Sequence, residues 1–383
     1  MATLPAEWLP YGRQDVVEDD IAAVVRALRS DWLTTGPAVP AFEEAVAKVA
    51  GVPHAVAVSS GTAALHAAYA ALGIGPGDEV IVPAITFAAT SNAALYLGAR
   101  PVFADLDPDT LLVSPDDVER KTTPQTRAIV AVDYAGQPCD YDALRDIARA
   151  RDLPLVADAC QALGASFRGR PAGSLADLTT FSFHPVKTIT TGEGGMVTTA
   201  DPDRARWLRA FRNHGMTTDH RERSESGTVF SDMVLLGYNY RLTDFQAALG
   251  MSQLARMGET LARRRALAAR YDQELAGIRH VRALKRLADR AHANHLYVVR
   301  LDTEALGLSR AQVLAKLRKA GIGGNVHYRP PYLHPYYREH LGTRPGLCPI
   351  AEDAAERIVT LPLHTRMTEE DVSRVVGALA EIG

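Results

Sequence analysis

Short apolar runs alternate with longer helical stretches between residues 54 and 199. The runs are rich in valine and isoleucine, and the stretches between them are rich in alanine. Runs that are apolar on both faces and separated by helices are typical of parallel strands covered by helices. The pattern predicts seven strands, at 54–58, 79–82, 101–104, 128–132, 154–158, 178–183 and 195–198. We therefore expect an α/β fold with a seven-stranded, mostly parallel sheet in a large domain.

The pattern changes after Tyr240. A proline-free helical stretch at 243–275 begins with a threonine that can cap it, so we expect one long helix that leaves the large domain. The rest predicts a smaller α+β domain, with a strand at 294–301, a helix at 309–319 and a closing helix from Thr368. The expected division is a large domain at 1–250 and a small C-terminal domain at 251–383.

Composition and charge narrow the class of protein. The chain has 383 residues, of which 47% are hydrophobic and 23% charged, so a globular protein is favoured over a disordered or fibrous one. A formal charge of -3 gives no broad field for nucleic acid or an anionic membrane. The N-terminal MATLPAEWLPYGRQ does not resemble a signal peptide, and no apolar run is long enough to span a bilayer. We expect a cytoplasmic protein with reduced cysteines.

The segment FSFHPVKTITTGEGG at 181–195 places Lys187 just after a predicted strand. A lysine at a sheet edge can form a Schiff base with an aldehyde cofactor and then act as the general base that moves a proton between carbons. An isolated lysine is more often an exposed surface residue, so the interpretation depends on the residues around it.

Three other positions provide that context. Asp158 ends a predicted buried strand, and ligands of open α/β sheets bind at such strand ends. A carboxylate there can keep a pyridine nitrogen protonated. Asp158 can equally cap a helix. The stretch SSGTAALHAA enters a helix at Thr62, and such a start can bind phosphate or be an ordinary capped turn. Phe87 follows the next strand and can stack on a flat cofactor or fill the core.

Six motifs in order resemble the DegT/DnrJ/EryC1/StrS family of pyridoxal-phosphate (PLP) dependent sugar aminotransferases. They are SDWLTTGP at 30–37, SSGTAAL at 59–65, PAITFAAT at 83–90, VADACQALGA at 156–165, FSFHPVKTITTGEGG at 181–195 and GYNYRLTDFQAALG at 237–250. The resemblance implies the fold type I of aspartate aminotransferase. It also implies an enzyme that exchanges an amino group in two steps, from L-glutamate to PLP and from the amine form of the cofactor to a nucleotide-linked keto-sugar.

The resemblance also implies roles for individual residues. Lys187 and Asp158 are implied as the catalytic residues, with Asp158 facing the pyridine nitrogen. The remaining cofactor contacts are implied to be Gly61, Thr62 and Ser182 at the phosphate, Phe87 stacked on the ring, Gln161 on the ring hydroxyl side, and Asn239 reaching the phosphate from the neighbouring subunit of a homodimer. The implied substrate contacts are Tyr11, Thr35, Arg241, His327 and Tyr328.

Within the family, LPYGRQ at 9–14, VDYAGQP at 132–138 and FHPVK at 183–187 resemble the UDP-4-amino-4,6-dideoxy-N-acetyl-β-L-altrosamine transaminases of pseudaminic acid synthesis. This likeness implies amination of C4 of a UDP-linked 4-keto-6-deoxy sugar. Gln161 stands where those enzymes often have histidine, so amination at C3 or of a dTDP-linked sugar remains open. A non-catalytic sensor of the same fold also remains open, whereas a sugar dehydratase would carry histidine in place of Lys187.

Two further patterns are given structural interpretations. The arginines at 263–265 lie among alanine and leucine, and we interpret them as a solvated helix face rather than a polyanion site. His292 and His295 can share a helix face, yet no closely spaced third ligand accompanies them, so no metal is expected.

Overall fold

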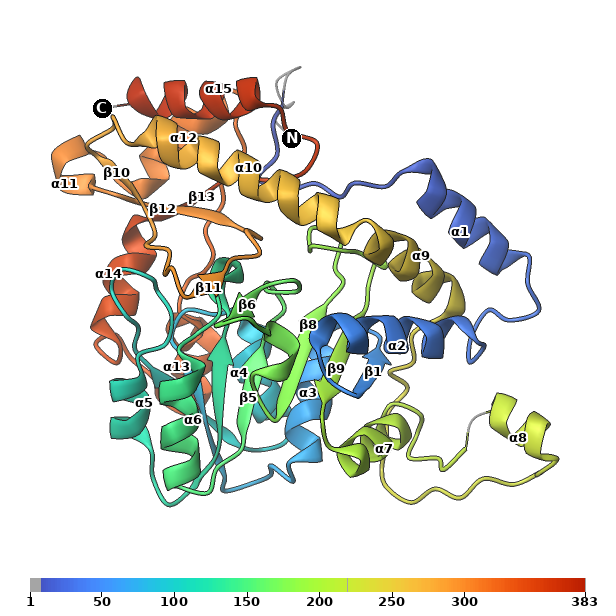
Figure 1. The fold of residues 1–383 in the computed structure, drawn as a ribbon. Helices are drawn as coiled ribbons and strands as arrows, with labels where there is room; N and C mark the ends of the chain where they lie inside the picture. The colour runs from blue at the N-terminus through green and yellow to red at the C-terminus, as the bar shows by residue number, and fades with distance from the viewer. Residues whose placement is uncertain (1–7, 219, 383) are drawn as a thin grey trace.

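The computed structural model describes residues 8–218 and 220–382, so the first seven residues of the N-terminal segment lie outside the described residues. A seven-stranded sheet forms the centre, in the order β1-β9-β8-β5-β4-β2-β3 (Figure 1). Its strands are β1 (His54–Val58), β2 (Glu79–Pro83), β3 (Arg100–Ala104), β4 (Thr126–Val132), β5 (Leu155–Asp158), β8 (Leu178–Ser182) and β9 (Gly195–Thr199). Only β9 runs antiparallel to its neighbours in this sheet. The predicted α/β fold is confirmed, and each predicted strand is present.

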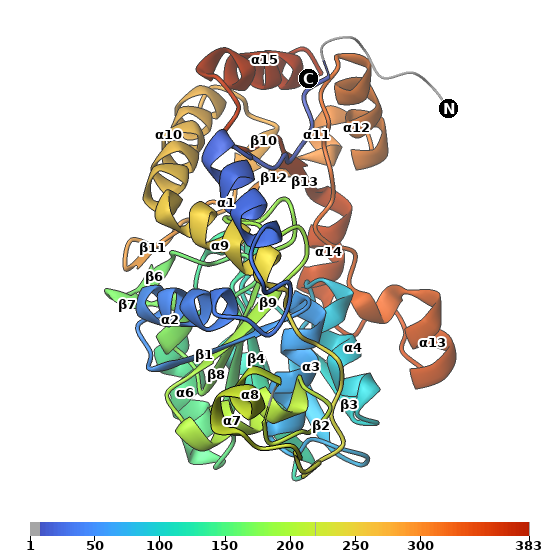
Figure 2. The same ribbon diagram turned by 90° about the vertical axis from the view of Figure 1, so that its right-hand side faces the viewer.

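Helices cover both faces of this sheet. Figure 2 shows α2 (Ala38–Ala50) and α6 (Tyr141–Ala150) on one side, and α3 (Gly61–Ala71) and α4 (Ala88–Tyr96) on the other. Burial on both faces explains why the central strands are continuous apolar runs, as in β4 and β5. The other helices of this half are α1 (Glu18–Leu28), α5 (Pro115–Lys121), α7 (Pro202–Phe211) and α8 (His220–Ser226).

The C-terminal part has a three-stranded antiparallel sheet of β10 (Val281–Ala283), β12 (Tyr297–Leu301) and β13 (Ile358–Leu361). A separate core packs between this sheet and the helices α12 (Arg310–Lys319) and α15 (Glu369–Ala380). Its smaller helices are α11 (Thr303–Leu306), α13 (Pro335–Leu341) and α14 (Pro349–Arg357). A second small sheet joins the two parts of the chain, with β6 (Ser166–Phe167) and β7 (Arg170–Pro171) from the first part and β11 (Arg290–Ala291) from the second. The boundary between residues 250 and 251 stays a prediction.

Strand β12 starts three residues later than predicted. Asn294 has a positive φ of 52°, and the amides of His295 and Leu296 both donate to the carbonyl oxygen of Ala135. The chain is therefore held against the large sheet before it joins the small one.

The predicted single helix at 243–275 is two helices. Thr243 caps α9 (Asp244–Ala255), as expected, and α10 (Met257–Leu275) follows after a break at Arg256. The backbone of Arg256 leaves the helical region, and its guanidinium donates to a carboxylate oxygen of Asp20 on α1 at 2.9 Å. Glycine has a low helix propensity, and Gly258 lies just after the break.

The interpretation of the arginines at 263–265 as a solvated face is wrong for Arg264. Its side chain is only 3% exposed, and Nη1 donates to the carbonyl oxygens of Asn294, His295 and Leu363. Arg264 thereby ties α10 to the segment before β12 and to the chain after β13, and burial lowers its pKa to about 10. His292 and His295 lie outside any helix, so they do not share a helix face.

Two observations concern the described residues as a whole. None of their helices is both long and apolar enough to cross a membrane. Within the same residues, no three His, Cys, Asp or Glu side chains gather closely enough to hold a metal ion.

Candidate active site

Lys187 lies in the loop between β8 and β9, at the edge of the large sheet. Its amide donates to the carbonyl oxygen of His184 at 2.9 Å, which folds the loop back toward the sheet. Burial lowers the pKa of the Lys187 amine, and the negative charge of the Asp158 carboxylate acts in the opposite direction. A lowered pKa favours the neutral amine, which is the nucleophilic form.

Asp158 ends β5, between β4 and β8, and is only 6% exposed. Its Oδ2 accepts a hydrogen bond from the Thr90 hydroxyl at 2.6 Å, and its Oδ1 accepts from the backbone amide of Cys160 at 3.2 Å. The Thr90 hydroxyl also lies 2.6 Å from that of Thr86. No helix begins after Asp158, so the alternative role as a helix cap is wrong.

Thr90 was not singled out from the sequence, although it lies within the motif PAITFAAT. Thr90 lies in the first turn of α4, whereas Thr86 lies before the helix, so no helical spacing in the sequence pointed to the pair. The partner carboxylate lies 68 residues further along the chain, so the sequence did not point to the pair.

Helix α3 begins at Gly61 immediately beside the end of β8. Ser60 caps it by accepting from the amide of Ala63 at 3.0 Å, whereas the amides of Gly61 and Thr62 have no acceptor among the described residues. A Cβ added to Gly61 would lie 2.9 Å from the Cβ of Ser182, which explains why glycine is needed there. Gly61, Thr62 and Ser182 therefore come together, and two free amides at a helix start favour an anion such as a phosphate.

Gln161 joins the sheet edge to the C-terminal part. Its Oε1 accepts from the amide of Ala135 at 2.7 Å, and its Nε2 donates to the hydroxyl of Tyr328 at 3.0 Å. These two bonds fix which end of the amide faces which neighbour. The ring of Phe87 lies 5.8 Å from that of Tyr328 and is 59% exposed, so the alternative of a core phenylalanine is wrong.

His327 and Tyr11 continue the same row of side chains. The ring of His327 lies 4.9 Å from Tyr328 and 5.2 Å from Tyr11. Its Nδ1 lies 2.8 Å from the hydroxyl of Thr360, and its carbonyl accepts from the hydroxyl of Tyr134. Burial, and next the charge of Lys187, lower the pKa of His327 to about 4. Three of the five predicted substrate contacts, Tyr11, His327 and Tyr328, thus adjoin the predicted cofactor residues.

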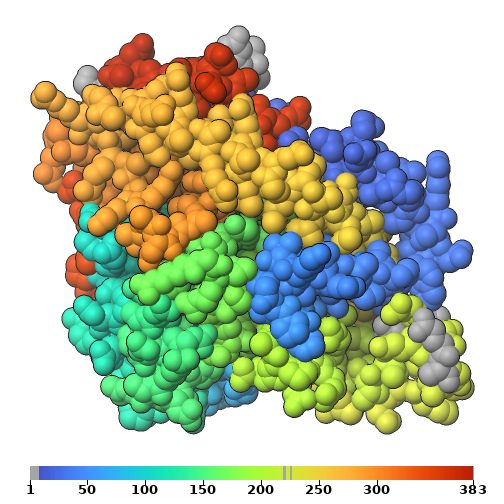
Figure 3. Space-filling model, in the orientation of Figure 1, coloured from blue at the N-terminus to red at the C-terminus, as the bar shows by residue number. Residues whose placement is uncertain are grey.

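Asn239, Arg241 and Thr35 do not join this group. Asn239 lies on a segment at 213–241, which we call the arm and which is described apart from residue 219. Asn239 is exposed, and in the described part of the chain it forms no hydrogen bond with Gly61, Thr62 or Ser182. Figure 3 shows the yellow-green residues that include the arm at the lower right margin of the molecule.

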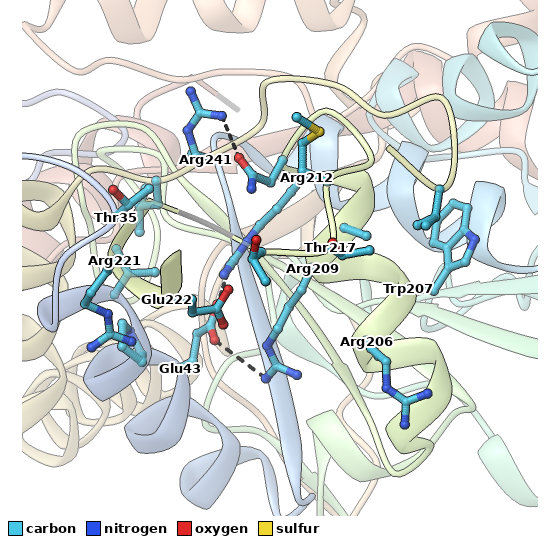
Figure 4. A pocket seen from close by; sticks show the side chains of 18 of the residues that line it. Thr35, Glu43, Arg206, Trp207, Arg209, Arg212, Thr217, Arg221, Glu222 and Arg241 are labelled. Carbon is cyan, nitrogen blue, oxygen red and sulfur yellow. Dashed lines mark hydrogen bonds and ion pairs between the residues drawn. The ribbon is translucent and has the colours of Figure 1, made fainter. Parts of the chain in front are cut away.

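Thr35 and Arg241 line a separate cavity of about 520 Å³. Figure 4 shows Thr35 and Arg221 on one side and the α7 residues Arg206 and Trp207 on the other. Arg241 donates to the side-chain oxygen of Asn213 at 2.8 Å. The lining contains neither Lys187 nor the other predicted cofactor residues. One chain therefore places the predicted site residues in two groups.

Comparisons with known proteins concern the chain as a whole. A sequence profile of the DegT/DnrJ/EryC1/StrS aminotransferase family matches residues 14–380. One similar structure is named as a sugar aminotransferase of Streptococcus pneumoniae in its PMP form, where PMP is pyridoxamine phosphate, the amine form of the cofactor. It is 35% identical to this chain, with a TM-score of 0.92 and 98% of each chain covered. The PLP form of that protein has a TM-score of 0.91.

Two further structures are similar over nearly their full lengths. PseC of Helicobacter pylori, an aminotransferase involved in the biosynthesis of pseudoaminic acid, is 30% identical, with a TM-score of 0.92, 98% of this chain covered and 99% of that one. DesI, solved in the presence of its TDP-sugar product, is 34% identical, with a TM-score of 0.89, 99% of this chain covered and 94% of that one.

The fold and these comparisons define a PLP-dependent sugar aminotransferase of fold type I. The chain belongs to the DegT/DnrJ/EryC1/StrS aminotransferase family, which its profile match and its sequence identity to solved members both show.

Proposed function

We propose that the protein moves the amino group of L-glutamate to the C4 keto carbon of a UDP-linked 4-keto-6-deoxy N-acetyl hexose, as a homodimer with shared active sites. The sugar assignment is supported by the motifs LPYGRQ, VDYAGQP and FHPVK and by the similarity to PseC, which acts in pseudoaminic acid biosynthesis. The similarity to DesI, solved with a TDP-sugar, makes a dTDP-linked sugar the first alternative to test.

One observation carries the catalytic part of the proposal. Lys187 is half-buried, and the pKa of its amine is lowered. The amine interacts electrostatically with Asp158, which lies at the carboxyl end of the strands. A nucleophilic amine and a buried carboxylate at this edge are the two groups that transamination requires.

The residues present fit PLP. An anion site, which we call the phosphate cradle, is formed by the unpaired amides of Gly61 and Thr62 beside the hydroxyl of Ser182. Gly61 has no side chain, so nothing from this residue fills the space next to Ser182. The carboxylate of Asp158 suits a protonated ring nitrogen, and the exposed ring of Phe87 suits stacking on a flat ring. Pyridoxal phosphate supplies an aldehyde carbon that takes up the amino group and a ring that withdraws electrons from the reacting carbon.

Lys187 has two tasks in this proposal. Its neutral amine would hold the cofactor until the amino substrate displaces it. The freed amine would then take a proton from the α-carbon of the amino substrate and deliver it to the former aldehyde carbon of the cofactor. The lowered pKa helps the second task, because a general base works best when its pKa is near the working pH.

Four hydrogen bonds orient two side chains around Lys187. The hydroxyl of Thr90 and the amide of Cys160 hold both oxygens of Asp158, so the carboxylate is oriented before anything binds. Gln161, fixed by Ala135 and Tyr328, presents its side-chain amide beside the same edge. We assign Tyr11, His327 and Tyr328 to the sugar that this chain's Lys187 acts on.

We assign Asn239, Arg241 and Thr35 to the active site of a second copy of the chain. Support comes from the exposure of Asn239, the separate cavity that Thr35 and Arg241 line, and the exposed apolar residues of the arm. Those apolar residues are Val229, Phe230, Met233, Val234 and Leu236. Contiguous exposed apolar surface is typical of a protein interface.

The experiment has two stages. The purified protein incubated with PLP should be yellow, and glutamate should convert that absorbance to that of the amine form of the cofactor. The amine form should then be incubated with UDP- and dTDP-linked 3-keto and 4-keto sugars, with products identified by mass spectrometry and NMR. Amination of C4 on the UDP-linked sugar supports the proposal, and amination of another sugar corrects it. A yellow protein whose spectrum ignores every amino donor would favour a sensor.

A further inference from the structure

His66 lies on α3, four residues after Thr62, so the two share one face of the helix. It is only 3% exposed, and four aromatic rings surround it, those of Tyr96, Phe211, Tyr238 and Tyr240, with centroids 5.0 to 5.9 Å away. All four meet the imidazole close to edge-on, at 70° to 78°. A polar ring has therefore been enclosed in an aromatic cage.

The polar contact of His66 is made with the arm. Its Nδ1 lies 3.0 Å from the hydroxyl of Tyr240, and its Nε2 has no hydrogen-bond partner among the described residues. The rings of Tyr238 and Tyr240 stack on each other with their centroids 5.1 Å apart. The rings around His66 therefore include those of both residues next to Asn239 in the chain. Two tyrosines that alternate with an exposed residue point to one side of an extended segment, which leaves Asn239 facing the other.

The backbone of the same stretch is fixed to the end of α7. The amide of Tyr238 donates to the carbonyl of Phe211 at 2.7 Å, and the amide of Tyr240 donates to that of Arg212 at 2.9 Å. These bonds set the register of the segment against the end of α7. Among the described residues, the hydrogen bond between His66 and Tyr240 links the arm to α3.

We propose that His66 is a positioning residue that holds the 238–241 segment so that Asn239 and Arg241 reach the active site of a second copy of the chain. This rests on the proposed function, because it requires the cofactor and the shared site. The helix that begins at one subunit's phosphate cradle then also fixes the arm that completes its partner's site. His66 itself touches neither cofactor nor substrate.

Three variants separate the ring from the hydrogen bond. His66→Phe keeps an aromatic ring at this position but loses the hydrogen bond to Tyr240. Tyr240→Phe removes the hydroxyl that forms the other half of that bond. His66→Asn keeps a polar atom near the Nδ1 position. We expect His66→Phe and Tyr240→Phe each to weaken PLP binding roughly fivefold, as the loss of one hydrogen bond does, and the double variant to be no worse than either. His66→Asn should recover part of the loss. Tyr96→Phe, which also contacts the His66 ring but lies outside the arm, should bind PLP normally.

Hybrid dimers of differently tagged chains test whether the effect crosses the interface. The first hybrid pairs a Lys187→Ala chain with a His66→Phe chain, so the intact lysine receives a normal arm. The second pairs a Lys187→Ala, His66→Phe chain with a wild-type chain, so the intact lysine receives the altered arm. Both contain the same substitutions and one working site. At a PLP concentration well below its dissociation constant, we expect the first to keep single-site turnover and the second to lose about fivefold.

Opposite results would overturn the inference. A loss in the first hybrid but not the second would mean that His66 acts on its own subunit's site. Equal turnover in both hybrids, with only a lower Tm, would mean that His66 is structural. Failure of the wild-type protein to bind PLP or to form dimers would instead contradict the proposed function.

Discussion

The group around Lys187 and the arm at 213–241 are built in opposite ways. Around Lys187, Asp158 and Gln161 are buried, and each is held by two hydrogen bonds within the chain. On the arm, Phe230 is 87% exposed and Val229 is 81% exposed. The first group is ready for a ligand as it stands, whereas the second presents apolar side chains that nothing in the described chain covers.

This difference supports the proposal that two copies of the chain share their active sites. Exposed apolar surface is costly to leave in water, and burying a side chain such as phenylalanine contributes about 2 kcal/mol. A chain that half-buries Lys187 while it exposes the apolar side chains of its arm is suited to burying that arm against a partner. The following changes test the two regions separately, from the largest expected effect to the smallest.

Lys187→Ala should lower kcat by roughly a thousandfold or more, because the base that moves the proton is lost. The arm is untouched, so the variant should still form dimers. Steady-state turnover and sedimentation measure the two properties, and Lys48→Ala on the exposed surface of α2 is the control. Near-normal turnover by Lys187→Ala would contradict the role of Lys187 as the base that moves the proton.

Phe230→Asp should weaken dimerisation by about thirtyfold, the usual effect of removing a central interface side chain. The fold should remain, since the ring is exposed in the single chain. Sedimentation equilibrium gives the dimer constant, and circular dichroism checks the fold. Tyr336→Asp, at an exposed ring on α13, is the matched control. An unchanged dimer constant would show that the arm does not reach a partner.

Thr90→Val should reduce kcat about tenfold, because a hydrogen bond to a charged carboxylate is lost while volume is kept. Thr86→Val should do less, since Thr86 bonds to Thr90 and not to Asp158. Turnover and the absorbance maximum of the bound cofactor are the measurements. Equal effects of the two variants would argue against orientation of Asp158 by Thr90.

Asp133→Asn should flatten the pH dependence of stability. Burial raises the pKa of Asp133 from 3.8 to about 7, so the folded state favours the protonated carboxyl. Its contribution to stability is complete below the unfolded pKa and is lost as the pH rises through the folded one. Urea unfolding should show the wild type losing stability relative to the variant between about pH 4 and 7. Parallel curves for the two proteins would contradict this.

Much of the Lys187 region could be predicted from the sequence because its signals are local. The apolar run that ends at Asp158 marks a strand end, and SSGTAAL marks a helix start. Parallel strands bring such ends to one edge, so local signals were enough to predict that these residues gather there. The roles of the individual residues remain predictions.

The features that escaped prediction depend on distant partners. Arg264 looked like a solvated arginine because its neighbours in sequence suit a helix surface, but its carbonyl partners lie about 30 and 99 residues away. The break at Arg256 and the cage around His66 likewise depend on α1 and on the arm. The periodicity of one segment does not report what packs against it.

The central claim is that the ε-amine of Lys187 holds the cofactor. Reduction of the yellow protein with sodium borohydride, followed by proteolysis and peptide mass spectrometry, locates the attachment point directly. The account predicts that the reduced pyridoxyl phosphate group is carried by the peptide that contains Lys187. A modified peptide containing a different lysine, or no modified peptide from a protein that had been yellow, would contradict it.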